Sequence, residues 1–123
     1  MIPDNLREIM IHNASELEND LHKDHEPVVK LFSKYGKPIW LLSELDPEND
    51  IAFGLCDLGN GKPELGYVSI AHLESIKHAK LKVPMVEYDP EFIGKFPMSI
   101  YLKAALRQGR VTFDQQILKE VLQ

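Results

Sequence analysis

Apolar positions recur at two different spacings along this chain. In residues 3–21 they recur every three or four positions, and Pro3 suits a first helical turn, so we predict an amphipathic helix there. In residues 28–70 they gather instead in short β-branched and aromatic runs separated by turn residues. This second pattern predicts four strands, VVKLF (28–32), IWLLSEL (39–45), IAFGLCD (51–57) and ELGYVSI (64–70).

The C-terminal half returns to helical spacing. Ser69 is placed to cap a short helix that carries Ile70, Leu73 and Ile76, and a possible edge strand follows near residues 83–88. A helix is predicted over 97–108, closed by Gly109, and Thr112 with Gln115 forms a capping box for a last helix. The whole predicts one α+β domain over residues 1–123, a two-layer fold in which an antiparallel meander of four or five strands is covered by N-terminal and C-terminal helices.

Asn60-Gly61 between two strand-like runs predicts a two-residue hairpin turn. In that register Gly54 faces Tyr67, and Asp57 faces Glu64, although like charges placed opposite each other destabilise a strand pair. One reading is an acidic pair that receives a basic side chain of a partner, or a cation. The other is that a neighbouring lysine, a bulge or solvent screening relieves the pair, or that the register is wrong.

Other candidate chemistry fails at defining positions. The glycine-rich stretch FGLCDLGNGKPELGYVS has Glu64 where a dinucleotide fingerprint needs its third glycine, and Cys56 and Pro63 where a P-loop needs a glycine and a hydroxyl. Cys56 in an apolar strand is expected to pack as a small hydrophobic residue rather than to act as a nucleophile. The donors clustered in residues 20–26 favour a solvated connector over a metal site, and we expect neither metal nor cofactor.

Charge limits the classes of partner. The net charge is −5, with the excess of acids in residues 1–26 and a slight excess of bases in residues 70–123. This distribution argues against direct nucleic-acid binding, which needs a concentrated basic patch. A single cysteine, no visible secretory leader and no long apolar run predict a cytoplasmic protein without membrane association, as a monomer or homodimer.

The stretch IWLLSELDPENDIAFGLCDLGNGKPELGYVS resembles the core of an uncharacterised domain-of-unknown-function family, DUF2958, carried by plasmids and integrative conjugative elements. The resemblance is dense over residues 28–76 and implies a prokaryotic cytoplasmic protein linked to mobile DNA, without implying a reaction. Position by position it picks out Trp40, Glu44, Asp46, Pro47, Phe53, Gly54, Cys56, Asp57, Gly59, Gly61, Pro63, Glu64, Gly66 and Tyr67.

Our leading hypothesis is a small non-catalytic accessory protein that binds a protein partner. No catalytic residue is assigned, and the candidate binding residues are Asp57, Glu64, Trp40, Glu44, Asp46 and Tyr67. One alternative is an acidic mimic that inhibits a restriction enzyme or nuclease, for which −5 is a small charge. A second is a hydrolase that uses Cys56, or a metal held by Asp57 and Glu64.

Overall fold

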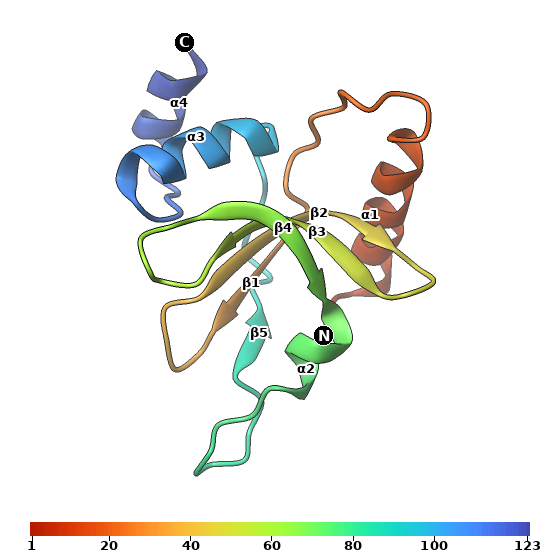
Figure 1. Ribbon diagram of the computed structural model, residues 1–123, viewed down its shortest axis with the longest axis vertical. Coiled ribbons are helices and arrows are strands. Elements are labelled where there is room, and N and C mark those ends of the chain that lie inside the picture. The colour runs from red at the N-terminus through yellow and green to blue at the C-terminus, as the bar shows by residue number, and fades with distance from the viewer.

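The computed structural model describes residues 1–123 and contains one antiparallel five-stranded sheet in the order β4-β3-β2-β1-β5 (Figure 1). The strands are β1 (Val29–Ser33), β2 (Ile39–Asp46), β3 (Ile51–Asp57), β4 (Glu64–Ser69) and β5 (Val86–Tyr88). The helices are α1 (Asp4–Glu16), α2 (Ile70–Ser75), α3 (Met98–Gln108) and α4 (Gln115–Leu122). The α+β class, the meander and the edge strand are confirmed.

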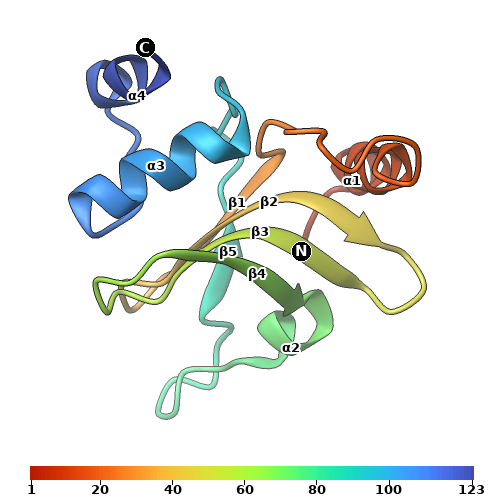
Figure 2. The same cartoon turned by 45° about the horizontal axis from the view of Figure 1, so that its top comes forward.

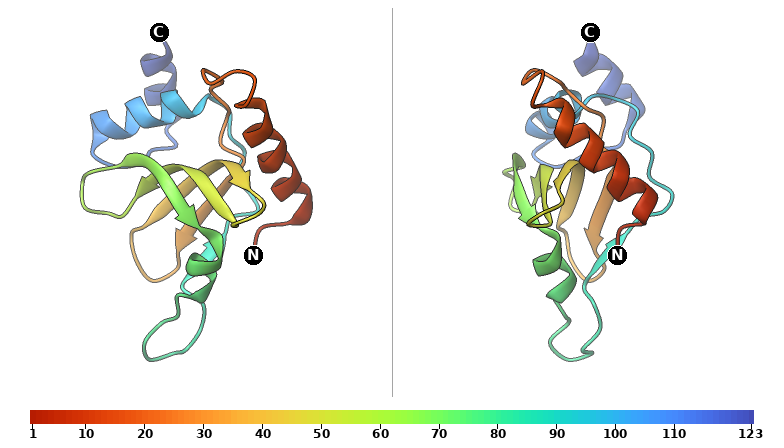
Figure 3. Two further views of the ribbon diagram at one scale, coloured as in Figure 1. Left: turned by 45° about the vertical axis from the view of Figure 1, so that its right-hand side comes forward. Right: turned by 90° about the vertical axis from the view of Figure 1, so that its right-hand side faces the viewer.

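The helices pack at different parts of the sheet. Helix α1 packs against β2, α2 against β4, and α3 against both β3 and α4. Figure 2 shows α1 and the α3–α4 pair above the strands, at the two ends of the sheet, with α2 below them. The side views of Figure 3 show the same separation of α2 from α3 and α4. Helix α1 lies beside the end of β2 that does not pair with β1, so it borders both faces of the sheet.

The core has two parts because β2 is buried on both of its faces. Trp40 and Leu42 belong to a cluster with residues of α1 and α2, whereas Leu41 belongs to a cluster with residues of α3 and α4. Successive residues of a strand point to opposite faces, so the two clusters lie on opposite sides of the sheet at β2. This burial on both faces explains why IWLLSEL is an almost continuous apolar run.

A β-bulge interrupts this alternation at Ser43. Leu42 pairs with Gly54 but Glu44 pairs with Phe53, so the pairing of β2 with β3 shifts by one residue between Leu42 and Glu44. Asn13 of α1 donates its side-chain N–H to the Ser43 carbonyl oxygen over 3.0 Å. The bulge turns Glu44 to the face opposite Leu42, whereas in a regular strand these two side chains would share a face.

Two predicted helix boundaries need correction. Helix α1 ends at Glu16 and not at residue 21, because the next residues form isolated turns, starting with the bond from Leu17 N to Ala14 O. The cap of α4 is Asp114, whose carboxylate accepts from the N–H groups of Gln116 and Ile117, so the Thr112 capping box is wrong. The helix predicted over 97–108 is confirmed, with Gly109 at its C-terminal cap at a φ of 75°.

The predicted β3–β4 register is wrong by one residue. Gly54 faces Gly66, Phe53 faces Tyr67, and Glu64 faces Cys56 instead of Asp57. A type I′ turn needs positive φ at both central residues, but in this turn positive φ occurs only at Gly59 and Gly61. The connection is accordingly a longer loop in which Asn60 accepts a hydrogen bond from the N–H of Lys62.

Candidate functional site

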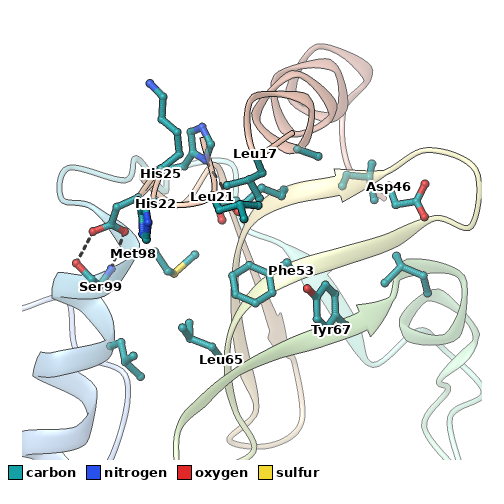
Figure 4. A pocket seen from close by; sticks show the side chains of 18 residues that line it. Leu17, Leu21, His22, His25, Asp46, Phe53, Leu65, Tyr67, Met98 and Ser99 are labelled. Atoms are coloured by element: carbon teal, nitrogen blue, oxygen red, sulfur yellow. Dashed lines mark hydrogen bonds and ion pairs between the residues drawn. The ribbon is translucent and has the colours of Figure 1, made fainter. Parts of the chain in front are cut away.

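A groove of about 620 Å³ lies between α1, the open face of the sheet and the start of α3 (Figure 4). Most of the residues that line it are apolar. Phe53 and Tyr67 stand side by side on β3 and β4, Leu17 and Leu21 face them from the segment that follows α1, and Met98 lies across the groove. Its volume falls in the range that is usual for ligand-binding pockets, about 300–1,000 Å³.

The bulge in β2 determines which side chains face this groove. Glu44, Phe53 and Tyr67 are paired across β2, β3 and β4, so they form one row on the same face of the sheet. The rings of Phe53 and Tyr67 are tilted against each other, with centroids 5.1 Å apart. An acid thus adjoins an aromatic pair along one cross-strand row.

Glu44 is linked to α1 through His25. The His25 ring lies between two acids, with Nε2 3.1 Å from Glu16 Oε1 and Nδ1 3.9 Å from Glu44 Oε1. The side chains of His25 and Glu44 are only 10% and 9% exposed. Glu16 also pairs with Lys23 over 3.4 Å. A chain of acid, imidazole and acid therefore runs from Glu16 at the end of α1 to Glu44, and His25 and Glu44 line the groove.

The pKa values of Glu16 and Glu44 are shifted in opposite directions. The hydrogen bond with His25 holds the pKa of Glu16 below its usual value, and Lys23 adds to this effect. Burial raises the pKa of Glu44, against an opposing effect of His25 and with a further rise from the negative charge of Asp24. The ionised form of Glu44 is consequently not well stabilised by the groups around it.

The segment that closes one end of the groove is fastened to α3. Asp24 accepts a hydrogen bond from the Ser99 N–H over 3.0 Å and also bonds the Ser99 hydroxyl, as Figure 4 shows. The Met98 N–H donates to the His25 carbonyl oxygen over 2.9 Å. Ser99 Oγ is thus engaged by Asp24, and His25 is held in place rather than solvated. The connector predicted for residues 20–26 is wrong at His25.

Of the six predicted binding residues, the fold brings three together. Glu44, Asp46 and Tyr67 line the groove. Trp40 is instead buried in the first cluster of the core. Asp57 is buried as well, and Glu64 is exposed on the opposite face of the sheet, so the two carboxylates do not meet. The predicted acidic pair is wrong, and with it the metal site that the pair was to form.

The Asp57 carboxylate has partners within the chain. Its two oxygens accept from the N–H groups of Gly59, over 2.9 Å, and of Val111, over 2.8 Å. These bonds join the β3–β4 loop to the segment that follows α3. The position of Asp57 is explained by folding, whereas Glu44 has no such explanation.

Comparison with known protein families adds one finding. The family model described as "Protein of unknown function (DUF2958)" matches residues 1–112. The chain belongs to the DUF2958 family. The match includes all five strands and every residue of the groove, so the groove is part of the DUF2958 domain, while α4 follows the matched region. No curated protein and no solved structure matches the chain.

The remaining sequence candidates can be placed in this DUF2958 structure. Cys56 is half-buried on the face away from the groove, and burial together with the charge of Glu64 raises its pKa to about 11. At neutral pH this thiol is protonated and a poor nucleophile. No three His, Cys, Asp or Glu side chains are grouped so that they could hold a metal ion. None of the helices has the length and apolar character needed to cross a membrane.

The groove also contains residues that sequence reasoning missed. His25, Ser43 and Phe53 were not among the predicted binding residues, yet all three line it. One available signal was the pair Ser43-Glu44, which interrupts an otherwise apolar central strand. A polar pair in such a strand is typical of a bulge or of a functional site.

The buried acid leads to a prediction about pH. We expect Glu44→Gln to stabilise the protein at pH 8, by about 1 kcal/mol, and to have little effect at pH 4. Because the pKa of Glu44 is raised in the folded state, its protonated form favours folding at low pH, and this contribution is lost as the pH rises through the folded-state pKa. Thermal unfolding of both proteins between pH 4 and pH 8 measures the difference. A lower stability of the variant at pH 8 would show that the attraction of His25 outweighs burial.

Proposed function

We propose that this protein is a non-catalytic binding protein that docks a partner protein in the groove between α1, the sheet and α3. The observation that carries the proposal is the continuity of the groove with exposed apolar residues at its rim. Leu21 is 83% exposed, Tyr67 76% and Leu65 39%, and all three line the groove. A small ligand inside the groove would leave these side chains in water, whereas a polypeptide would cover them.

The free edge of the sheet adds to this proposal. Strand β4 is the last strand on its side of the sheet and carries Leu65 and Tyr67. Unpaired N–H and C=O groups of an edge strand can pair with an extended segment of another chain. A partner segment beside β4 would also reach the aromatic row in the groove. The role of such a protein as a cytoplasmic accessory of a prokaryotic mobile element is part of the same proposal and is supported by the family resemblance.

Site-specific crosslinking tests this function. We expect a photoreactive benzoylphenylalanine in place of Tyr67 to crosslink a defined partner in the native host, while the same group in place of Leu81 does not. Leu81 is a matched control because it is 57% exposed and lies in the loop between α2 and β5, away from the groove. The substitution Leu21→Ser should reduce the crosslink at position 67 and change stability little, because the Leu21 side chain is largely exposed. Equal capture at positions 67 and 81, or none at position 67, would refute the proposal.

A further inference from the structure

Three buried polar atoms of the groove have no hydrogen-bond partner within the chain. They are Glu44 Oε2, the Ser43 hydroxyl oxygen and His25 Nδ1, and all three residues line the groove. When the His25 ring is neutral and donates its Nε2–H to Glu16, its Nδ1 is an acceptor. Buried polar atoms in native proteins nearly always have a partner, so these three atoms mark a place where hydrogen-bonding groups from outside the chain would be favoured.

The groove also lacks a positive charge to match Glu44. Lys23 pairs with Glu16, and no lysine or arginine forms an ion pair with Glu44. His25 is the nearest basic group, and its Nδ1 is 3.9 Å from Glu44 Oε1, beyond hydrogen-bond distance. A donor-rich group that enters from outside with a positive charge would satisfy both the carboxylate and the free acceptors.

The aromatic row beside Glu44 restricts the kind of cation. Phe53 follows Glu44 directly across the strands, and Tyr67 follows Phe53. Ring faces attract cations, and the apolar wall suits the stem of a long basic side chain. A guanidinium has five donors in a rigid plane and is more weakly hydrated than an ammonium group, so it fits several acceptors in an apolar groove better than lysine does.

We propose that the groove receives an arginine side chain of the partner protein, with its guanidinium on Glu44 and its stem against Phe53 and Tyr67. This inference rests on the proposed function, because it names the group by which the partner is recognised. The bulge at Ser43 is the structural device behind it, since it turns Glu44 out of the strand's regular alternation and into the groove.

Three small probes with the same ring test the inference: benzylguanidinium, benzylammonium and benzyl alcohol. Titration of the isotope-labelled protein, followed by NMR at the amides of Glu44, Phe53 and Tyr67, gives the affinity of each probe. We expect benzylguanidinium to bind about tenfold more tightly than benzyl alcohol, with benzylammonium between them. Equal affinities, or no binding of any probe, would overturn the inference. Benzylammonium binding as tightly as benzylguanidinium would overturn the choice of arginine.

Two variants test whether Glu44 is the residue that causes the preference for charged probes. Glu44→Gln should abolish the preference for the charged probes, whereas Glu48→Gln, which removes the same charge from the exposed β2–β3 turn, should retain it. A preference that survives in Glu44→Gln refutes the assignment to Glu44. The crosslinking at position 67 distinguishes the docking of a partner protein from the recognition of an arginine. If the crosslink forms while the probes show no charge preference, only the recognition of an arginine is refuted. If it fails while the preference is present, the groove binds a cation but the docking of a protein is refuted.

Discussion

Gly54→Ala is expected to destabilise the protein by at least about 3 kcal/mol, more than half of the stability of a marginal domain. A Cβ atom at position 54 would lie 1.9 Å from the Leu41 carbonyl oxygen and 2.8 Å from Leu42 Cα. Both are backbone atoms of β2, so no side-chain rotation relieves the overlap. The neighbouring strand has to move, and with it the bulge that positions Glu44.

The structure contains a matched control for this substitution. Gly66 lies directly opposite Gly54 on β4, and the nearest atom to a Cβ there is Cys56 Sγ at 4.0 Å. We therefore expect Gly66→Ala to change the free energy of unfolding by no more than about 1 kcal/mol, in either direction. Urea denaturation followed by the fluorescence of Trp40, the single and buried tryptophan, measures both variants. Equal losses at the two positions would show that the approach of β2 is not what requires glycine at position 54.

The orientation of Glu44 could not be predicted from the alternation of residues along a strand. In a regular strand Glu44 would share a face with Trp40 and Leu42, inside the core. The bulge places it opposite Phe53 instead, and a bulge depends on contacts with other elements, here the bond from Asn13 to the Ser43 carbonyl. Glu44, Asp46 and Tyr67 were identified as candidates without it, but the groove that unites them was not.

Local signals predicted the elements well and their relative positions less well. Period-two and helical patterns, together with Pro97 and Gly109, placed the four meander strands and α3 close to their observed bounds. The end of α1 was missed because Leu17 and Leu21 continue the helical spacing while facing the groove from non-helical turns. Likewise His25 looks like part of a polar connector, and only the docking of that segment on α3 buries it between Glu16 and Glu44.

The predicted register of the β3–β4 hairpin was wrong for the same reason, because contacts between residues distant in the sequence shape this loop. Asn-Gly is a strong local signal, but the loop is shaped by the bond from the Val111 N–H to Asp57, residues that lie 54 positions apart. Figures 1 and 2 show this loop beside the C-terminal end of α3, where the chain turns toward α4. An error of one residue was enough to create an apparent acidic pair from a structural aspartate and an exposed glutamate.

Asp57→Ala is the second substitution with a large expected effect, a loss of about 3 kcal/mol in the free energy of unfolding. Asp57 is 4% exposed, and its removal leaves the N–H of Val111, itself 7% exposed, without an acceptor. An unsatisfied buried donor costs about 1–3 kcal/mol, and the charge-assisted bond to Gly59 is lost as well. Faster hydrogen exchange at the Val111 amide should accompany the loss, because its protection depends on this carboxylate.

Glu64→Gln separates this structural role from a role in binding. Glu64 is exposed, so the variant should unfold within about 0.5 kcal/mol of the wild-type protein and keep the Val111 amide protected. Asp57→Asn, which retains one acceptor oxygen, should fall between Asp57→Ala and the wild type. In the opposite pattern, Asp57→Ala would be fully stable but unable to capture the partner crosslinked at position 67. That result would show that Asp57 takes part in binding. A loss of binding that follows the loss of stability would instead be a consequence of unfolding, because Asp57 acts by joining the hairpin to the segment after α3.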